Sequence, residues 1–190
     1  MAKVDIFELV LAAVLSVAIG LSFSLWSMLY AAVTPILTVL GIKHILSGFW
    51  LIAGLLPAFI IRRAGIAIFS ETLAALIEAF ISQWGIMACA FGFVQGIGAE
   101  IIFALFLYKH WNLLTLSLAA MCSALFSYAL EYVYYGQWTL NFSFHARQLL
   151  VFGLSSILFG ALPAWYLAKK LVKTGLLNNF KIVTNAKKPN

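Results

Sequence analysis

The sequence predicts an all-α integral membrane protein with six transmembrane helices, because it is poor in charge and contains long apolar stretches. Of its 190 residues, 64% are hydrophobic and 9% are charged, and the mean hydropathy is +1.04. A soluble domain usually carries about 25% charged residues, whereas about 20 consecutive apolar residues can cross a bilayer. We therefore expect residues 1–190 to form a single transmembrane domain.

The first three predicted helices are bounded by charged residues. The first, 6–29, follows Asp5 and is too long for a signal-peptide core of about 7 to 15 residues. The second, 45–61, ends at a pair of arginines, and the third, 65–82, begins after them. The apolar connection 30–44 between the first two helices is expected to lie on the membrane surface or to fold over a pocket.

The last three predicted helices are 84–108, 113–135 and 146–168, followed by a basic tail, 169–190. The net charge is +6, but the basic residues gather at the ends of the apolar stretches. This placement is typical of membrane topology and not of a nucleic-acid-binding patch. With a cytoplasmic N-terminus, ten basic residues lie inside: Lys3, Arg62, Arg63, Lys109, Lys169, Lys170, Lys173, Lys181, Lys187 and Lys188. Only Lys43 and Arg147 lie outside, so both termini are expected to be cytoplasmic.

Carboxylates within the predicted helices are candidates for a ligand site. A charge at the bilayer centre costs roughly 2.5 to 3.5 kcal/mol on insertion scales. At 1.5 Å per residue, Glu78 and Gln95 both lie roughly 21 to 22 Å above the inner ends of their helices. Glu71 and Glu100 lie lower, at roughly 12 to 13 Å, so we expect these two to serve helix packing.

A third wall for this outer level is predicted on the fifth helix. Tyr128, Glu131, Tyr132 and Tyr135 follow the i, i+3, i+4, i+7 spacing of one helix face. The same level holds Trp84, Trp138, His145 and Gln148. An interfacial aromatic belt is an alternative for the rings, but it does not account for the carboxylates and amides. Aromatic faces with carboxylates suit a small, flat ligand with amine donors or a positive charge.

The sequence offers no pattern for catalysis, a metal or a cofactor. It has no HExxH around its histidines and no CxxC, and Cys89 and Cys122 lie in apolar stretches as small filler. It also lacks a GxxxxGK[ST] phosphate loop, so we do not expect it to hydrolyse ATP. An intramembrane enzyme is thus the weaker interpretation.

Small residues recur every four positions in two helices. On the first helix, Ala12, Ser16 and Gly20 form such a stripe, which permits close approach of another helix. Docking of a partner subunit and internal packing are both open for this stripe. For Ala88, Gly92 and Gly96 on the fourth helix, we expect internal packing.

Two stretches carry a family resemblance. The segments GFWLIAGLLPAFIIRRAGIAIFSETLAALIE and GFVQGIGAEIIFALFLYKHW resemble the YkoE-type S components of energy-coupling-factor (ECF) vitamin transporters, which are associated with thiamine and its hydroxymethylpyrimidine precursor. The positions that match the family's polar signature are Glu71, Glu78, Gln95 and Glu100.

The resemblance implies a six-helix S-component fold in the bacterial plasma membrane, with a pocket open to the outside. It also implies partners, namely a membrane coupling protein and two ATPase subunits. We expect thiamine or hydroxymethylpyrimidine to lie between Glu78, Gln95, Glu131 and the surrounding rings. The alternatives are an S component for another vitamin, such as cobalamin, and a structural or regulatory subunit without a ligand.

Overall fold

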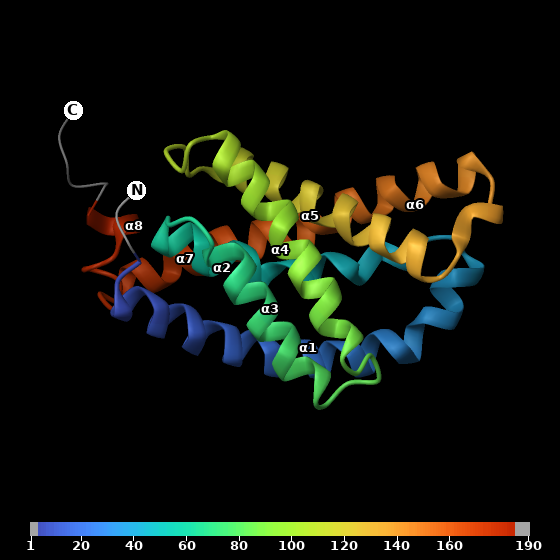
Figure 1. Ribbon diagram of the computed structural model, residues 1–190, viewed down its shortest axis with the longest axis horizontal. Helices are drawn as coiled ribbons and strands as arrows, with labels where there is room; N and C mark the ends of the chain where they lie inside the picture. Colours follow the sequence, from blue (N-terminus) through green and yellow to red (C-terminus); the bar gives the residue numbers. More distant parts are fainter. Residues whose placement is uncertain (1–3, 185–190) are drawn as a thin grey trace.

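The computed structural model describes residues 4–184 as an elongated bundle of helices, as the sequence predicts (Figure 1). Lys3, Lys187 and Lys188, which were assigned to the inner side, lie outside the described residues. The elements are α1 (Ile6–Val39), η1 (Lys43–Leu51), α2 (Ile52–Ile61), α3 (Ile66–Ala79), α4 (Met87–Leu105), α5 (Leu113–Tyr134), η2 (Gln137–Thr139), α6 (Phe142–Ser155), η3 (Ser156–Ala161), α7 (Leu162–Lys173) and α8 (Lys181–Thr184).

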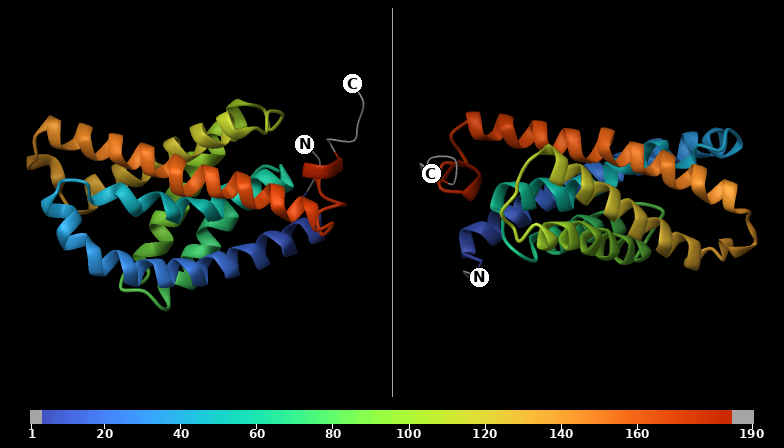
Figure 2. Two further views of the ribbon diagram at one scale, coloured as in Figure 1. Left: turned by 180° about the vertical axis from the view of Figure 1, so that it is seen from behind. Right: turned by 90° about the horizontal axis from the view of Figure 1, so that it is seen from above.

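Helix α1 is longer than predicted. Its N-terminus is fixed by a capping box between Asp5 and Glu8, and the helix continues through Pro35 to Val39. The predicted helix end at residue 29 is therefore wrong, since only a tight turn at Gly41, with φ of 71°, separates α1 from η1. Of the two expectations for 30–44, the structure favours a place at the pocket, because Tyr30, Lys43 and His44 line the cavity. The apolar composition of this segment extends the helix, and Figure 2 shows the bend near its end.

The second and last membrane segments each contain an irregular turn, and these turns touch. Residues 43–51 form a 3₁₀ helix before α2, and a π-helical segment, η3, joins α6 to α7. The Gly48 backbone N–H donates to Ser155 Oγ at 2.9 Å, and a Cβ at Gly160 would lie 2.9 Å from the Gly48 carbonyl oxygen. Backbone thus packs on backbone, which only glycine permits.

Five helical segments of the described chain are long and apolar enough to cross a membrane: Ile6–Val39, Lys43–Ile61, Met87–Leu105, Leu113–Tyr134 and Phe142–Lys173. Helix α3 has 14 residues, about 21 Å, which is less than the roughly 30 Å of a hydrocarbon core. It ends before the predicted residue 82 because residues 80–86 form turns.

The small-residue stripe on α1 faces the interior. Ala12 and Ser16 are fully buried, and a Cβ at Gly20 would lie 2.6 Å from the Ala74 carbonyl oxygen of α3. Docking of a partner on this stripe is therefore contradicted, because α3 already covers it. The stripe on α4 packs internally, as predicted, with Gly96 against the Ile68 backbone.

The two ends of the bundle differ in character. At one end, Glu8 pairs with Arg63 at 3.1 Å, and Lys181 donates to the Arg62 carbonyl oxygen at 3.2 Å. The start of α1 therefore lies beside the tail (Figure 1). The opposite end carries the connections 40–42, 80–86 and 135–141, and a cavity opens there.

Candidate ligand-binding site

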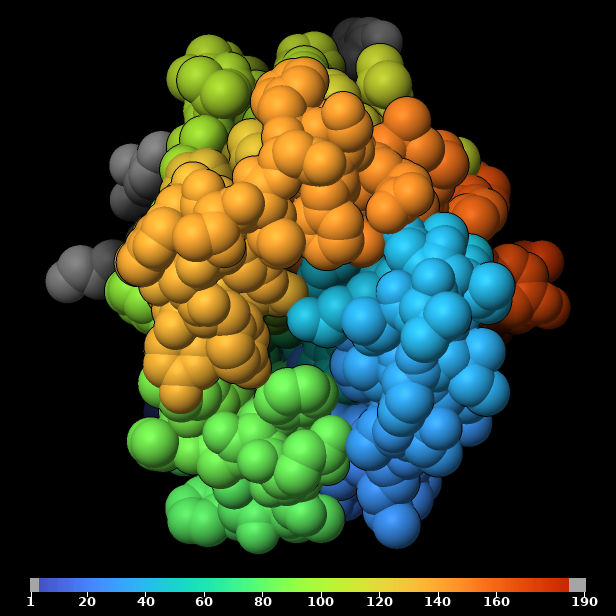
Figure 3. Space-filling view, turned by 90° about the vertical axis from the view of Figure 1, so that its right-hand side faces the viewer, coloured from blue at the N-terminus to red at the C-terminus, as the bar shows by residue number. Residues whose placement is uncertain are grey.

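A cavity of about 360 Å³ opens at the end of the bundle away from α8. Figure 3 views this end and shows the opening between the end of α1, the α3–α4 turn and the α5–α6 connection. Every helix from α1 to α6 except α2 contributes to the wall, together with η1. The lining residues are Phe23, Tyr30, Lys43, His44, Ser47, Trp50, Glu71, Ala75, Glu78, Gln83, Trp84, Met87, Ala88, Phe91, Gln95, Ser127, Glu131, Tyr134, Tyr135 and Phe152.

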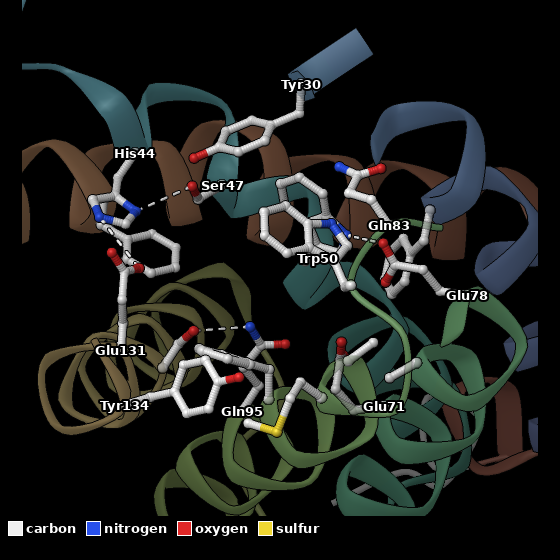
Figure 4. A pocket seen from close by; sticks show the side chains of 18 of the residues that line it. Tyr30, His44, Ser47, Trp50, Glu71, Glu78, Gln83, Gln95, Glu131 and Tyr134 are labelled. Carbon is white, nitrogen blue, oxygen red and sulfur yellow. Dashed lines mark hydrogen bonds and ion pairs between the residues drawn. The ribbon is translucent and has the colours of Figure 1, made fainter. Parts of the chain in front are cut away.

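Glu78 is held by two donors on one oxygen. Ser27 of α1 donates to Glu78 Oε1. The Trp50 indole N–H donates to the same oxygen at 2.9 Å (Figure 4). Neither group is charged, and Oε2 accepts no hydrogen bond from residues 4–184. The carboxyl is 2% exposed, so its second oxygen remains an acceptor at the cavity wall.

Aromatic rings surround this carboxyl. The Tyr30 ring lies edge-on to Trp50 with centroids 5.1 Å apart, and its centroid is 6.2 Å from that of Trp84. Trp84 Nε1 donates to Ser27 Oγ at 3.1 Å, which ties the α3–α4 turn to α1. Three rings and a carboxyl thus converge at one place, an arrangement that attracts an organic cation.

Glu71 also lies on the cavity, contrary to the expectation that depth removes it from the site. It is 1% exposed; Oε2 accepts the Gly54 backbone N–H, and Oε1 is buried without a partner within residues 4–184. Seven residues on a helix bring side chains back to nearly the same face, and the cavity extends deep enough to reach both carboxyls.

Gln95 lines the cavity from α4, the helix that packs against α3. Its Nε2 donates to Ser127 Oγ of α5 at 2.9 Å, and its backbone oxygen accepts from Ser123 Oγ at 2.7 Å. These bonds fix the amide, so its side-chain oxygen is the remaining acceptor.

The mouth carries an ion pair. Lys43 Nζ lies 2.8 Å from Glu131 Oε1, His44 Nε2 lies 3.6 Å from Oε2, and Gln137 Nε2 donates to Oε1 at 3.1 Å. The His44 ring stacks on Phe152 with centroids 5.0 Å apart. Beside the ammonium lies Tyr135, whose pKa is raised because burial disfavours the phenolate. The Lys43 ammonium thus already compensates the negative charge of Glu131.

Three comparisons bear on this geometry. Residues 7–126 match the family model described as an ABC-type cobalt transport system, permease component. A protein of Bacillus subtilis (strain 168) named as an HMP/thiamine permease, YkoE, is 31% identical over 142 residues, 74% of this chain and 71% of the relative. A solved structure described as an S-component of an ECF transporter superposes with a TM-score of 0.91 at 26% identity, covering 97% of this chain and 94% of the other.

The chain belongs to the YkoE-type family of ECF S components. The resemblance found in the sequence is thereby confirmed. The S component is a multi-pass protein of the cell membrane, and its relatives are transport proteins, not enzymes.

Five of the ten residues predicted for the ligand site line the cavity of this S component: Glu78, Gln95, Glu131, Tyr135 and Trp84. The other five are not among the lining residues. Tyr128 bonds His145 Nδ1 at 2.7 Å, Gln148 donates to the Gly41 carbonyl oxygen at 3.2 Å, and Tyr132 packs on Trp138, which is 62% exposed. The role of all ten in ligand binding stays a prediction.

Several lining residues escaped the sequence analysis. Trp50, His44 and Ser47 lie in η1, whose apolar sequence looks like an ordinary membrane helix. These residues lie three positions apart, the spacing of one face of a 3₁₀ helix, which an α-helical pattern does not follow.

Glu100 has a structural role. Its Oε1 accepts from the Gly65 backbone N–H at 2.6 Å and from the Tyr108 hydroxyl at 2.7 Å, and Oε2 accepts from the Ala67 N–H at 3.1 Å. The carboxyl thus satisfies the free N–H groups at the start of α3. Burial, and then the nearby carboxyl, raise the pKa of Tyr108.

Proposed function

We propose that this S component captures thiamine or its hydroxymethylpyrimidine precursor from outside the cell. The single observation that carries the proposal is Glu78, whose free oxygen faces a cavity ringed by Tyr30, Trp50 and Trp84. A carboxylate attracts a cationic or amine-bearing ligand, and aromatic faces hold a cationic ring. The name of the Bacillus subtilis relative supports the same ligand class.

The size of the cavity favours a small vitamin. Sites for small organic ligands occupy roughly 300 to 1,000 Å³, and this cavity holds about 360 Å³. A ligand as large as cobalamin exceeds that volume, which weighs against this alternative.

A bare cobalt ion, which the family description names, also fits less well. Transition-metal ions bind to several converging nitrogen, oxygen or sulfur ligands. Within residues 4–184, no three His, Cys, Asp or Glu side chains lie close enough together to hold a metal. The aromatic lining favours an organic ligand instead.

The proposed topology has six passes: the five long segments and the shorter α3. Both termini lie in the cytoplasm and the cavity mouth lies outside. The ten-to-two bias of basic residues supports this orientation. Because the sequence has no phosphate loop, energy for uptake would come from partners, namely a membrane coupling protein and two ATPase subunits.

The test is titration of purified wild-type protein and Glu78→Gln with thiamine by calorimetry. The amide oxygen retains the bonds from Ser27 and Trp50, but an N–H group replaces the acceptor that faces the cavity. A charge-assisted contact is worth about 1.5 to 3 kcal/mol, so we expect thiamine to bind roughly ten- to a hundred-fold more weakly once the Glu78 charge is removed.

Mass spectrometry of copurified small molecules provides an independent check, because a structural or regulatory subunit would carry none. Equal affinity of Glu78→Gln and wild type for thiamine would contradict the proposal.

A further inference from the structure

The deepest polar group of the cavity is a carboxyl oxygen without a partner. Glu71 Oε1 is buried and accepts no hydrogen bond from residues 4–184, while Oε2 accepts the Gly54 N–H. An unpaired polar atom at such a position is costly. Since Glu71 lies on the cavity wall, the donor that Oε1 lacks can come from a ligand.

Neighbouring helices are shaped to admit this side chain. A Cβ at Gly54 of α2 would lie 2.9 Å from Glu71 Oε2, and a Cβ at Gly92 of α4 would lie 2.9 Å from the Glu71 backbone oxygen. Any larger residue at either position would displace the carboxyl or the backbone that carries it. Two helices thus leave space for Glu71 at the cavity wall.

The two carboxyls of α3 have different surroundings. They are seven residues apart, about 10.5 Å along the helix, and neither forms an ion pair within the described residues. Three aromatic rings cluster beside Glu78, where Trp50 bonds its carboxyl. Glu71 is instead surrounded by small residues, namely Gly54, Gly92 and Ala75. Figure 4 shows both carboxyls on the same side of the cavity, opposite Glu131.

We propose that Glu71 is a second ligand contact, which accepts a hydrogen bond from an amino group on a heteroaromatic ring, while Glu78 and its aromatic neighbours hold a second, cationic ring. The ligand class is therefore a two-ring organic cation whose amine-bearing ring enters first. This inference rests on the proposed function, because it assigns thiamine an orientation within the same cavity.

Glutamine is a sharp probe of Glu71. The carboxylate accepts from Gly54 through one oxygen and offers the other to the ligand. An amide has one oxygen and one NH₂ group, so it can accept from either Gly54 or the ligand amine but must direct a donor at the other. At Glu78, both protein donors use the same oxygen, so glutamine preserves them.

The experiment compares thiamine with oxythiamine, in which a carbonyl replaces the amino group and the cationic ring is unchanged. Both are titrated into wild type, Glu71→Gln and Glu78→Gln. We expect wild type to prefer thiamine by about tenfold or more, the loss expected for an unmatched polar contact. In Glu71→Gln the preference should fall to about threefold or less, whereas Glu78→Gln should weaken both ligands and keep the ratio.

Any other pattern of preference between thiamine and oxythiamine overturns the inference. A preference that survives in Glu71→Gln, or disappears in Glu78→Gln instead, would place the amine elsewhere. Wild type that binds both ligands equally would refute the role of Glu71 and leave the proposed function standing. Wild type that binds neither would refute the proposed function as well.

Melting temperature serves as the folding control for each variant. If Glu71→Gln does not fold, Glu71→Asp provides the same test, because it keeps the charge and withdraws the carboxyl by one methylene. We expect it to lose the preference for thiamine, and an unchanged preference would overturn the inference.

Discussion

At the residue scale, the glutamates of the described chain differ in how many of their oxygens the protein already uses. Glu8 pairs with Arg63, Glu100 accepts from three donors, and Glu131 faces Lys43 and His44. Glu71 and Glu78 each keep one oxygen without a hydrogen bond from the described residues. This difference separates carboxyls that stabilise the fold from those that can bind a ligand.

The ion pair at the mouth leads to a stability prediction. Glu131→Gln leaves the half-buried Lys43 ammonium without its carboxylate, so we expect the free energy of unfolding to fall by about 1 to 3 kcal/mol. The double variant Lys43→Met/Glu131→Gln should recover part of this loss, because no unpaired charge remains. Melting temperatures in detergent measure both effects.

A matched control for this pair is Lys173→Met, which removes the same charge from an exposed position of α7 and should change little. The stability lost in the double variant is compared with the losses in Glu131→Gln and Lys43→Met alone. If it equals their sum, the two residues are not coupled.

The sequence predicted part of this site for physical reasons. Glu78 and Gln95 are costly in a membrane and stand out in apolar helices, and both line the cavity. The depth estimate misplaced Glu71, because distance along a helix does not say how deep a cavity extends. The partner of Glu131 could not be foreseen, since Lys43 precedes it by 88 residues and was interpreted only as a topology marker.

At the element scale, close helix contacts depend on small residues in particular places. Gly48 and Gly160 bring η1 against η3, and Gly20 brings α1 against α3. The α1 stripe is a helix contact within the subunit, so its predicted role in docking a partner is wrong. The spacing of small residues does not say which helix approaches them. Likewise, the first helix was predicted to end at residue 29, whereas α1 runs through Pro35 to Val39 and contributes Tyr30 to the cavity wall.

The buried α1 stripe leads to a prediction about packing. Ser16 is fully buried and its hydroxyl donates to the Ala12 carbonyl oxygen at 2.7 Å. Ser16→Leu would overfill this face, so we expect the isolated subunit to lose about 1 to 3 kcal/mol of stability. The neighbouring Val17 is 40% exposed, so Val17→Leu is the matched control and should be nearly neutral. Melting temperatures of the two variants decide, and an unchanged value for Ser16→Leu would contradict the burial of the stripe.

At the scale of the whole molecule, charge and cavity lie at opposite ends. Arg62, Arg63 and Lys181 gather at the end beside the start of α1, whereas the cavity opens at the other end beside Lys43. If basic residues mark the cytoplasmic side, the cavity opens outward, as capture of an external vitamin requires. Orientation therefore decides whether the site can serve uptake.

Labelling of single cysteines tests this orientation. Cys89 and Cys122 are first replaced by alanine, because both are only partly buried. Trp138→Cys then places a thiol at the mouth, where the side chain is 62% exposed, and Lys173→Cys places one at the exposed end of α7. In intact cells, a membrane-impermeant maleimide should label the cysteine at 138 alone, and the one at 173 should react only after lysis. The reverse pattern would make the cavity face the cytoplasm, where it could not collect a vitamin from outside.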